Sequence, residues 1–101
     1  MSARLPSLAQ RKRALGIFRA IAHPDRLLVL IALGRSPVCV SDLAALCGRS
    51  QSAMSHQLRA LRRAGLVQSR RRGKQIFYAL RDRHVADLIQ GALAHASERA
   101  G

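Results

Sequence analysis

Four polar residues near the carboxyl end of the chain have the side chains and the spacing of a metal site. They are Asp82 and His84, with one residue between them, and His95 and Glu98, with two residues between them. The whole chain holds only four histidines and five acidic residues, and it is otherwise strongly basic. Imidazole nitrogens and carboxylate oxygens are both ligands of zinc. The pattern therefore predicts a bound metal ion.

The helix expected around these residues determines how such a site can close. Apolar residues of the stretch 83–99 follow the i, i+3, i+4, i+7 spacing of an amphipathic helix: Val85, Leu88, Ile89, Ala92, Leu93 and Ala96. On this helix His95 points within about 20° of His84 but lies about 16 Å further along the axis. Zinc–nitrogen bonds are only about 2 Å long, so one helix cannot bring all four ligands to one ion. An antiparallel copy related by a two-fold axis can, which predicts a homodimer with two equal sites between its subunits.

The ligand types favour zinc as the cofactor. Two imidazoles and two carboxylates without a thiolate suit a tetrahedral Zn(II) site, in which Co(II) could substitute, whereas Ni(II) usually takes more ligands. The alternative is that these residues are merely solvated or packed at the two ends of a helix. Asp87, three residues after His84, could compete as a carboxylate. We interpret it as a solvated residue or as one that supports a ligand.

Composition points to a nucleic-acid partner. With 101 residues the chain fits one domain, 1–101, and its net charge of +13 is typical of a protein that binds a polyanion. The absence of Trp and the presence of only one Tyr and two Phe disfavour base stacking of the kind used on RNA. No apolar run is long enough to span a membrane, and the first residues do not have the pattern of a secretory signal. We expect a cytoplasmic protein.

The segments that precede the metal-binding helix predict a helix-turn-helix and a wing. Residues 7–34 are expected to form two helices, broken at Pro24, and 41–64 two more, with Ser41 and Ser50 as N-caps. The second of these presents a polar and cationic face, and a Gly-containing turn precedes it. Two strands are expected within 66–79, joined by a basic tip over residues 70–74. The predicted fold is mainly α with a small β-hairpin: a homodimeric winged helix-turn-helix whose last helix, 83–99, forms the dimer and binds metal.

The same segments resemble the ArsR/SmtB family of winged-helix, metal-sensing repressors. The resemblance rests on Val38-Cys39-Val40-Ser41-Asp42-Leu43-Ala44, on the stretch Ser50-Gln51-Ser52-Ala53-Met54-Ser55-His56-Gln57-Leu58-Arg59, and on Leu61-Arg62 and Gly65-Leu66-Val67. It covers roughly residues 15 to 99. The Asp-x-His and His-x-x-Glu pairs match the subgroup with a zinc site on the C-terminal helix, where the ligands come from both protomers. Other members use a Cys-Val-Cys element; here Ser41 replaces its second cysteine and residues 1–38 contain none, which disfavours a thiolate site and the sensing of arsenic or cadmium.

The resemblance implies a homodimeric repressor that Zn(II) releases from a double-stranded DNA operator with inverted-repeat symmetry. We expect two groups of DNA-binding residues. Gln51, Ser52, Ser55, His56 and Arg59 would read bases in the major groove, and Arg70, Arg71, Arg72 and Lys74 would contact phosphates at or near the minor groove. The resemblance also suggests an allosteric link in which His95 donates a hydrogen bond to a backbone carbonyl near His56.

Three other functions are weighed against this one. The chain could be a metal-independent winged-helix regulator, or a thiol or persulfide sensor that uses Cys39 and Cys47. A zinc hydrolase is disfavoured, because the His-Glu-x-x-His motif is absent and a four-ligand site leaves no position for water. We therefore expect no catalytic residues and no small-molecule substrate.

Overall fold

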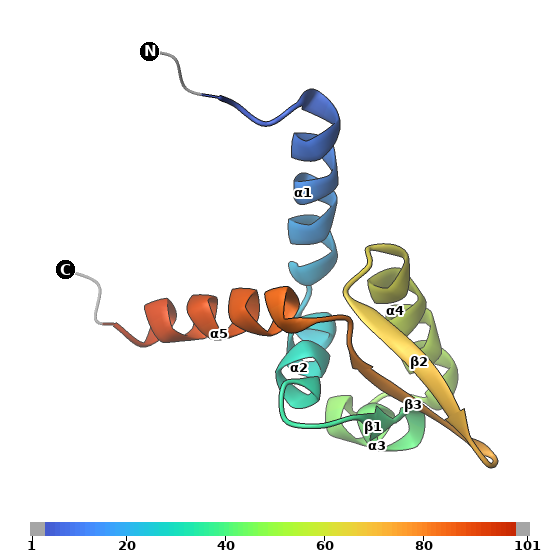
Figure 1. Cartoon of the computed structure of the whole chain (residues 1–101). Coiled ribbons are helices and arrows are strands. Elements are labelled where there is room, and N and C mark those ends of the chain that lie inside the picture. The colour runs from blue at the N-terminus through green and yellow to red at the C-terminus, as the bar shows by residue number, and fades with distance from the viewer. Residues whose placement is uncertain (1–3, 99–101) are drawn as a thin grey trace.

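The computed structural model describes residues 4–98 (Figure 1). In chain order the elements are α1 (Leu8–Ile21), α2 (Pro24–Leu33), β1 (Val38–Cys39), α3 (Val40–Cys47), α4 (Gln51–Arg63), β2 (Val67–Arg72), β3 (Gln75–Leu80) and α5 (Arg83–Ser97). The strands form one antiparallel sheet in the order β1-β3-β2. Helices α3 and α4 pack on each other and are followed by the hairpin of β2 and β3. The predicted winged helix-turn-helix is confirmed.

Local chemistry explains most of the helix boundaries. The hydroxyl of Ser7 accepts the backbone N–H of Gln10 at the start of α1, and the hydroxyl of Ser50 accepts that of Ala53 at the start of α4. Such N-caps satisfy amide groups that have no partner within the helix. Helix α3 ends at Gly48, whose φ of 64° is a left-handed conformation that glycine adopts without strain. The predicted ends of these helices agree with the structure to within one or two residues.

The segment before α3 differs from the prediction. Residues 38 and 39 form β1, which pairs with β3 through Val38 with Tyr78 and Cys39 with Phe77. Helix α3 therefore begins at Val40, and its N-cap is Cys39 instead of Ser41. The Ser41 hydroxyl lies inside the first turn, 3.2 Å from the Cys39 sulfur. A strand of two residues is too short to show a periodicity in the sequence, and its pairing depends on residues that lie 38 and 40 positions later.

The hairpin is also longer than predicted. Pairing continues to Arg72 with Gln75, so the turn consists only of Gly73 and Lys74. Gly73 has a φ of 59°, which suits the first position of a two-residue hairpin turn. The prediction that all of residues 70–74 form the tip is wrong, because the three arginines belong to β2. Successive side chains of a strand point to opposite faces, so Arg71 points away from the face shared by Arg70 and Arg72.

The hydrophobic core lies between α2, α3, α4, the sheet and the first half of α5. Its fully buried members are Val29, Leu30, Leu43, Met54, Leu58, Leu61, Leu66 and Val67. Helix α1 reaches the core only near its end, around Ala20, and the rest of α1 and the far half of α5 project from the body in different directions (Figure 1). Leu8, Leu15 and Phe18 of α1 are exposed, and only Val85 and Ile89 of the predicted apolar stripe of α5 are buried. Uncovered apolar surface of this kind is typical of a protein interface.

Helix α5 ends earlier than expected. Its last residue is Ser97, and Glu98 follows with an extended backbone. The end predicted at residue 99 lies outside the described residues. None of the helices within residues 4–98 has the length and apolar character needed to cross a membrane.

Candidate metal half-sites and DNA-binding surface

An imidazole and a carboxylate lie together at each end of α5. At the first end, Asp82 is the N-cap, and its Oδ1 accepts the backbone N–H of Val85 at 3.2 Å. His84 Nδ1 lies 3.7 Å from the same Oδ1 atom. At the other end, His95 Nδ1 lies 3.9 Å from Glu98 Oε2. We call these two pairs the metal half-sites.

Each half-site is open to solvent and offers two donors. The side chains of His84 and His95 are 94% and 86% exposed. Capping by Asp82 uses Oδ1, which leaves Oδ2 for a cation. No group of three or more histidines, cysteines or carboxylates that could hold a metal occurs within residues 4–98 of a single protomer. The donor set of either pair suits Zn(II), but two ligands fill only half of a tetrahedral site. Asp87 is exposed on the same helix.

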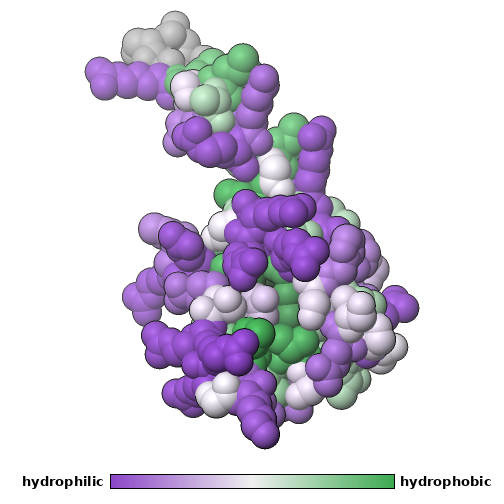
Figure 2. Space-filling view, turned by 90° about the vertical axis from the view of Figure 1, so that its right-hand side faces the viewer, coloured by the Kyte–Doolittle hydropathy of each residue, from purple (hydrophilic) through white to green (hydrophobic). Residues whose placement is uncertain are grey.

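The predicted reading residues share the exposed side of α4. Met54, Leu58 and Leu61 anchor the opposite side of the helix in the core. The exposed residues on the solvent side are Gln51, Ser52, Ser55, His56 and Arg59. Figure 2 views the molecule from the side of α4 and the hairpin, and it shows strongly hydrophilic side chains over most of this face. A helix held in this way can present its polar side to a DNA groove.

A cleft of about 350 Å³ lies between α4 and the wing. Its walls include Gln51 and Ser55 from α4, Lys74 from the turn of the hairpin, and Ser41 from the first turn of α3. The structure thus brings two reading residues and one predicted phosphate contact to one concave surface. Ser41 was not among the predicted DNA-binding residues, because its place beside the wing depends on the pairing of β1 with β3.

One contact lies within the wing, and another joins the wing to α4. The guanidinium of Arg72 lies 5.5 Å from the centre of the Phe77 ring, a cation–π arrangement. Arg62 Nη1 of α4 donates a hydrogen bond of 3.4 Å to the Ser69 hydroxyl of β2. Among the predicted phosphate contacts, Arg72 is therefore partly engaged within the protein. The four cationic residues of the wing, Arg70, Arg71, Arg72 and Lys74, are all exposed.

The two cysteines are poorly suited to act as reactive thiols. Cys39 is buried, and its sulfur lies against the Ser41 hydroxyl. Burial raises the pKa of the Cys47 thiol above its ordinary value; the nearby Asp25 carboxylate raises this pKa further, and Arg49 opposes both effects. Because the thiolate is the nucleophile, a raised pKa lowers the reactivity of Cys47 at neutral pH. These surroundings disfavour the thiol-sensor alternative.

Comparisons with known proteins agree with this arrangement. A transcriptional repressor SmtB homolog from Synechocystis sp. is 45% identical over 92 residues, which cover 91% of this chain and 70% of that protein. The HTH-type transcriptional regulator NmtR from Mycobacterium tuberculosis is 49% identical over 78 residues, 77% of this chain and 65% of that protein. The chain thus spans about two thirds of the length of these relatives.

A solved structure and a family model extend the comparison. The homodimeric winged helix-turn-helix DNA-binding domain from Mycobacterium bovis superposes with a TM-score of 0.87 at 27% identity, covering 97% of this chain and 92% of that one. Residues 23–69, which include α2, α3, α4 and the start of the wing, match the model described as bacterial regulatory protein, arsR family. The chain belongs to this ArsR family, whose members are DNA-binding transcriptional regulators and not enzymes.

Proposed function

We propose that this chain is a homodimeric repressor that leaves its DNA operator when Zn(II) binds at two sites between the subunits. The observation that carries the proposal is the pair of metal half-sites, with donors 3.7 and 3.9 Å apart at the two ends of one helix. That helix also carries uncovered apolar residues in its outer half. An interface along α5 would therefore bring complementary half-sites together.

In the proposed dimer each site takes two residues from either protomer. Asp82 and His84 would face His95 of the partner subunit and Glu98 of the partner subunit. The two carboxylates neutralise a divalent cation, so a complete site carries little net charge. Without a cation, each half-site leaves an imidazole and a carboxylate in water, where neither requires a partner. Zn(II) would supply four strong bonds that join the subunits at fixed distances.

DNA binding in this proposal uses both exposed surfaces described above. The reading residues of α4 enter the major groove, and the wing cations contact phosphates at or near the minor groove. Two-fold symmetry of the dimer predicts an inverted-repeat operator whose half-sites are about one helical turn apart. Phosphate contacts by arginine and lysine provide most of the affinity, which makes it strongly dependent on salt.

Release requires that the dimer with closed metal sites fit DNA less well than the dimer with open ones. A ligand shifts an equilibrium only through its different affinity for two states. By reciprocity, DNA must then weaken zinc binding by the same factor, typically about 5- to 150-fold. We place one link at His95, where one ring nitrogen faces Glu98 and the other would donate to a backbone carbonyl near His56. Such a hydrogen bond would orient the ring and transmit its position to α4.

The test is a DNA titration with and without zinc. An operator duplex would first be selected from a random library with the wild-type protein in the presence of a chelator. We expect zinc to weaken binding of this duplex about 5- to 150-fold, and His84→Ala and His95→Ala to abolish that effect. His95→Gln tests the link. Asp87→Ala is the matched control, because it removes an exposed acid from the same helix without touching either half-site.

Each result separates this proposal from an alternative. If the apo dimer binds zinc no more tightly than micromolar and DNA affinity does not change, the regulator is metal-independent. If zinc still releases DNA from His95→Gln, the link through His95 is wrong and His95 is not a required zinc ligand. Loss of the zinc effect in Asp87→Ala would place this residue among the groups that support the site.

A further inference from the structure

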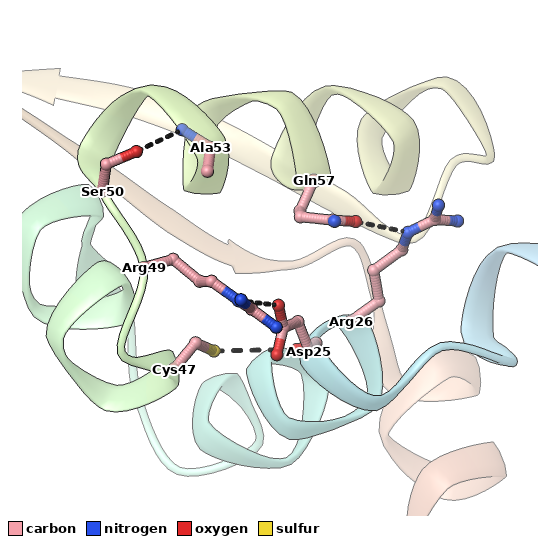
Figure 3. Close-up of polar contacts among 7 residues, drawn as sticks. All are labelled: Asp25, Arg26, Cys47, Arg49, Ser50, Ala53 and Gln57. Atoms are coloured by element: carbon pink, nitrogen blue, oxygen red, sulfur yellow. Dashed lines mark hydrogen bonds and ion pairs between the residues drawn. The ribbon is translucent and has the colours of Figure 1, made fainter.

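Asp25 and Arg26, adjacent residues in the first turn of α2, form side-chain bonds with residues of the helix-turn-helix (Figure 3). Arg26 Nε donates a hydrogen bond of 2.7 Å to Gln57 Oε1 in the middle of α4. On the other side, Arg49 Nε donates a bond of 2.8 Å to Asp25 Oδ2. Arg49 directly precedes Ser50, the N-cap of α4. The first turn of α2 therefore holds α4 at its middle, through Gln57, and at the residue just before its N-cap, through Arg49.

The spacing of these two points determines the direction of α4. Gln57 lies six residues after the first residue of the helix, which corresponds to about 9 Å along its axis. Apolar packing of Met54 and Leu58 keeps α4 on the core, but such packing is not directional and tolerates small rotations. Hydrogen bonds are directional and weaken steeply when their angle changes. Two of them at different heights resist both rotation and tilt.

The local environment strengthens both contacts. The Asp25 side chain is only 13% exposed, although that of Arg49 is 55% exposed. Arg26 and Gln57 are half-buried, so water competes less for their bond than on an open surface. Each bond has one charged partner at least, and such bonds are stronger than those between neutral groups. The Cys47 thiol, which contacts the Asp25 carbonyl oxygen at 3.9 Å, closes the same junction.

Arg26 also forms a hydrogen bond with α1. Its Nη1 atom donates a hydrogen bond of 3.2 Å to the carbonyl oxygen of Ala20, near the end of α1. One guanidinium thus joins α1 to α4. Helix α1 carries the uncovered residues Leu15 and Phe18, so any contact made by these residues acts on the element that Arg26 holds. A shift of α1 relative to the core would change the position of Arg26 and, through it, that of Gln57.

We infer that Asp25 and Arg26 are positioning residues for DNA reading and that Arg26 couples α1 to α4. The inference rests on the DNA-binding part of the proposed function and does not require the zinc sites. Neither residue needs to touch DNA. Their loss should lower the preference for the correct sequence, because the readers on α4 would no longer be held at a fixed angle. The general affinity for phosphates should stay the same, since the wing and α4 keep their cations.

The experiment compares Arg26→Gln, Gln57→Ala and the double variant in the presence of a chelator. The probes are the selected operator duplex and a scrambled duplex of equal length and composition. We expect each single variant to reduce the preference for the operator about tenfold, and the double variant to lose no more than either single one. Such non-additivity shows that both residues act through one bond. Arg35→Gln is the matched control, because it removes an exposed arginine just beyond the other end of α2.

The salt dependence of binding provides a second readout. A residue that contacts a phosphate contributes about 0.9 to the slope of log affinity against log salt. We expect this slope to be unchanged in Arg26→Gln, whereas a decrease would identify Arg26 as a phosphate contact and overturn the inference. Unchanged preference in Gln57→Ala would overturn it as well. Gln57→Ala keeps a strong helix former at this position, so it tests the contact even if Arg26→Gln fails to fold.

A reciprocal exchange tests Asp25 in the same assay. Asp25→Arg alone places two cations together and should reduce the preference for the operator about tenfold or more. Asp25→Arg combined with Arg49→Asp restores an ion pair and should recover most of it. If the combined variant is no better than the single one, Asp25 does not act through Arg49. Because the assay contains no zinc, its result stands whether or not the metal proposal survives.

Discussion

The candidate DNA-binding surface lies within one protomer, whereas a complete four-ligand metal site does not occur among residues 4–98 of one protomer. Gln51 and Ser55 of α4 and Lys74 of the wing line one cleft, and the hydrogen bond from Arg62 of α4 to Ser69 of β2 joins the same two elements. In α5 the helix itself keeps His84 and His95 on separate turns. The first surface depends on the tertiary fold, and the second would depend on a second copy of the chain.

This difference predicts which changes affect which function. A change that separates the subunits should remove the metal response entirely but leave a weak, unspecific affinity for DNA. A change on the wing should weaken DNA binding but leave zinc binding intact. The following predictions test this separation.

The largest effect is expected from Leu15→Asp in α1, because we expect the exposed apolar residues of α1 to extend the proposed interface along α5. Replacing Leu15 by a charged residue removes the stabilisation that burying the leucine gives, about 1.5–3 kcal/mol. A symmetric dimer loses this amount twice, because both subunits carry the substitution. We expect the dimer dissociation constant to rise at least 100-fold, measured by analytical ultracentrifugation, together with loss of tight zinc binding. Leu46→Asp in α3 is the control, since Leu15 and Leu46 are 47% and 48% exposed. Equal weakening of the dimer by both variants would place the interface elsewhere.

A smaller effect is expected from the wing arginines, and it should differ between them. Arg71 pairs with Ile76, which lines the cleft beside α4, while Arg72 on the opposite face stacks on Phe77. We expect Arg71→Gln to reduce the salt-dependence slope by about 0.9 per protomer and Arg72→Gln to reduce it less. Measured zinc affinity should be the same in both variants and in the wild type. A change in zinc affinity would contradict the separation of the two surfaces.

Asp82 allows the roles of helix cap and metal ligand to be measured separately. Asparagine is as good an N-cap as aspartate, so Asp82→Asn should retain the unfolding free energy but lose the carboxylate that zinc requires. Asp82→Ala should lose both, with a decrease in the unfolding free energy of about 1 kcal/mol. Urea unfolding in a chelator and zinc titration give the two values. Unchanged zinc affinity in Asp82→Asn would remove Asp82 from the ligand set.

The sequence predicted the elements whose signals are local. Caps such as Ser50, the glycine after α3 and the amphipathic pattern of α4 each act within one turn of helix, so helix-turn-helix and wing could be derived without coordinates. The two pairs on α5 were predicted as halves of a site for the same reason, because helix geometry alone determines their separation. Whether they close in a dimer stays a prediction.

Contacts between distant segments could not be predicted in this way. The strand of Val38 and Cys39 forms only because β3 offers an edge, and the cleft that includes Ser41 follows from that pairing. The bonds from Asp25 and Arg26 join residues that are 24 and 31 positions apart. In the sequence, Asp25 and Arg26 are charged residues in the first turn of a helix, and nothing nearby indicates their bonding partners. Only the packing of α2 against α3 and α4 gives them partners.

The smallest effect is expected at Cys47, which belongs to neither surface. Its raised pKa means a lower thiolate fraction at any given pH than in a free cysteine, so iodoacetamide should modify it more slowly at pH 8. The rate should rise about tenfold per pH unit until the pH passes this raised pKa, as followed by mass spectrometry. Cys47→Ser is the control, since it leaves only the buried Cys39. Modification as fast as that of a free cysteine would reveal an activated thiol, and the thiol-sensor alternative would then add a third responsive region to the two compared above.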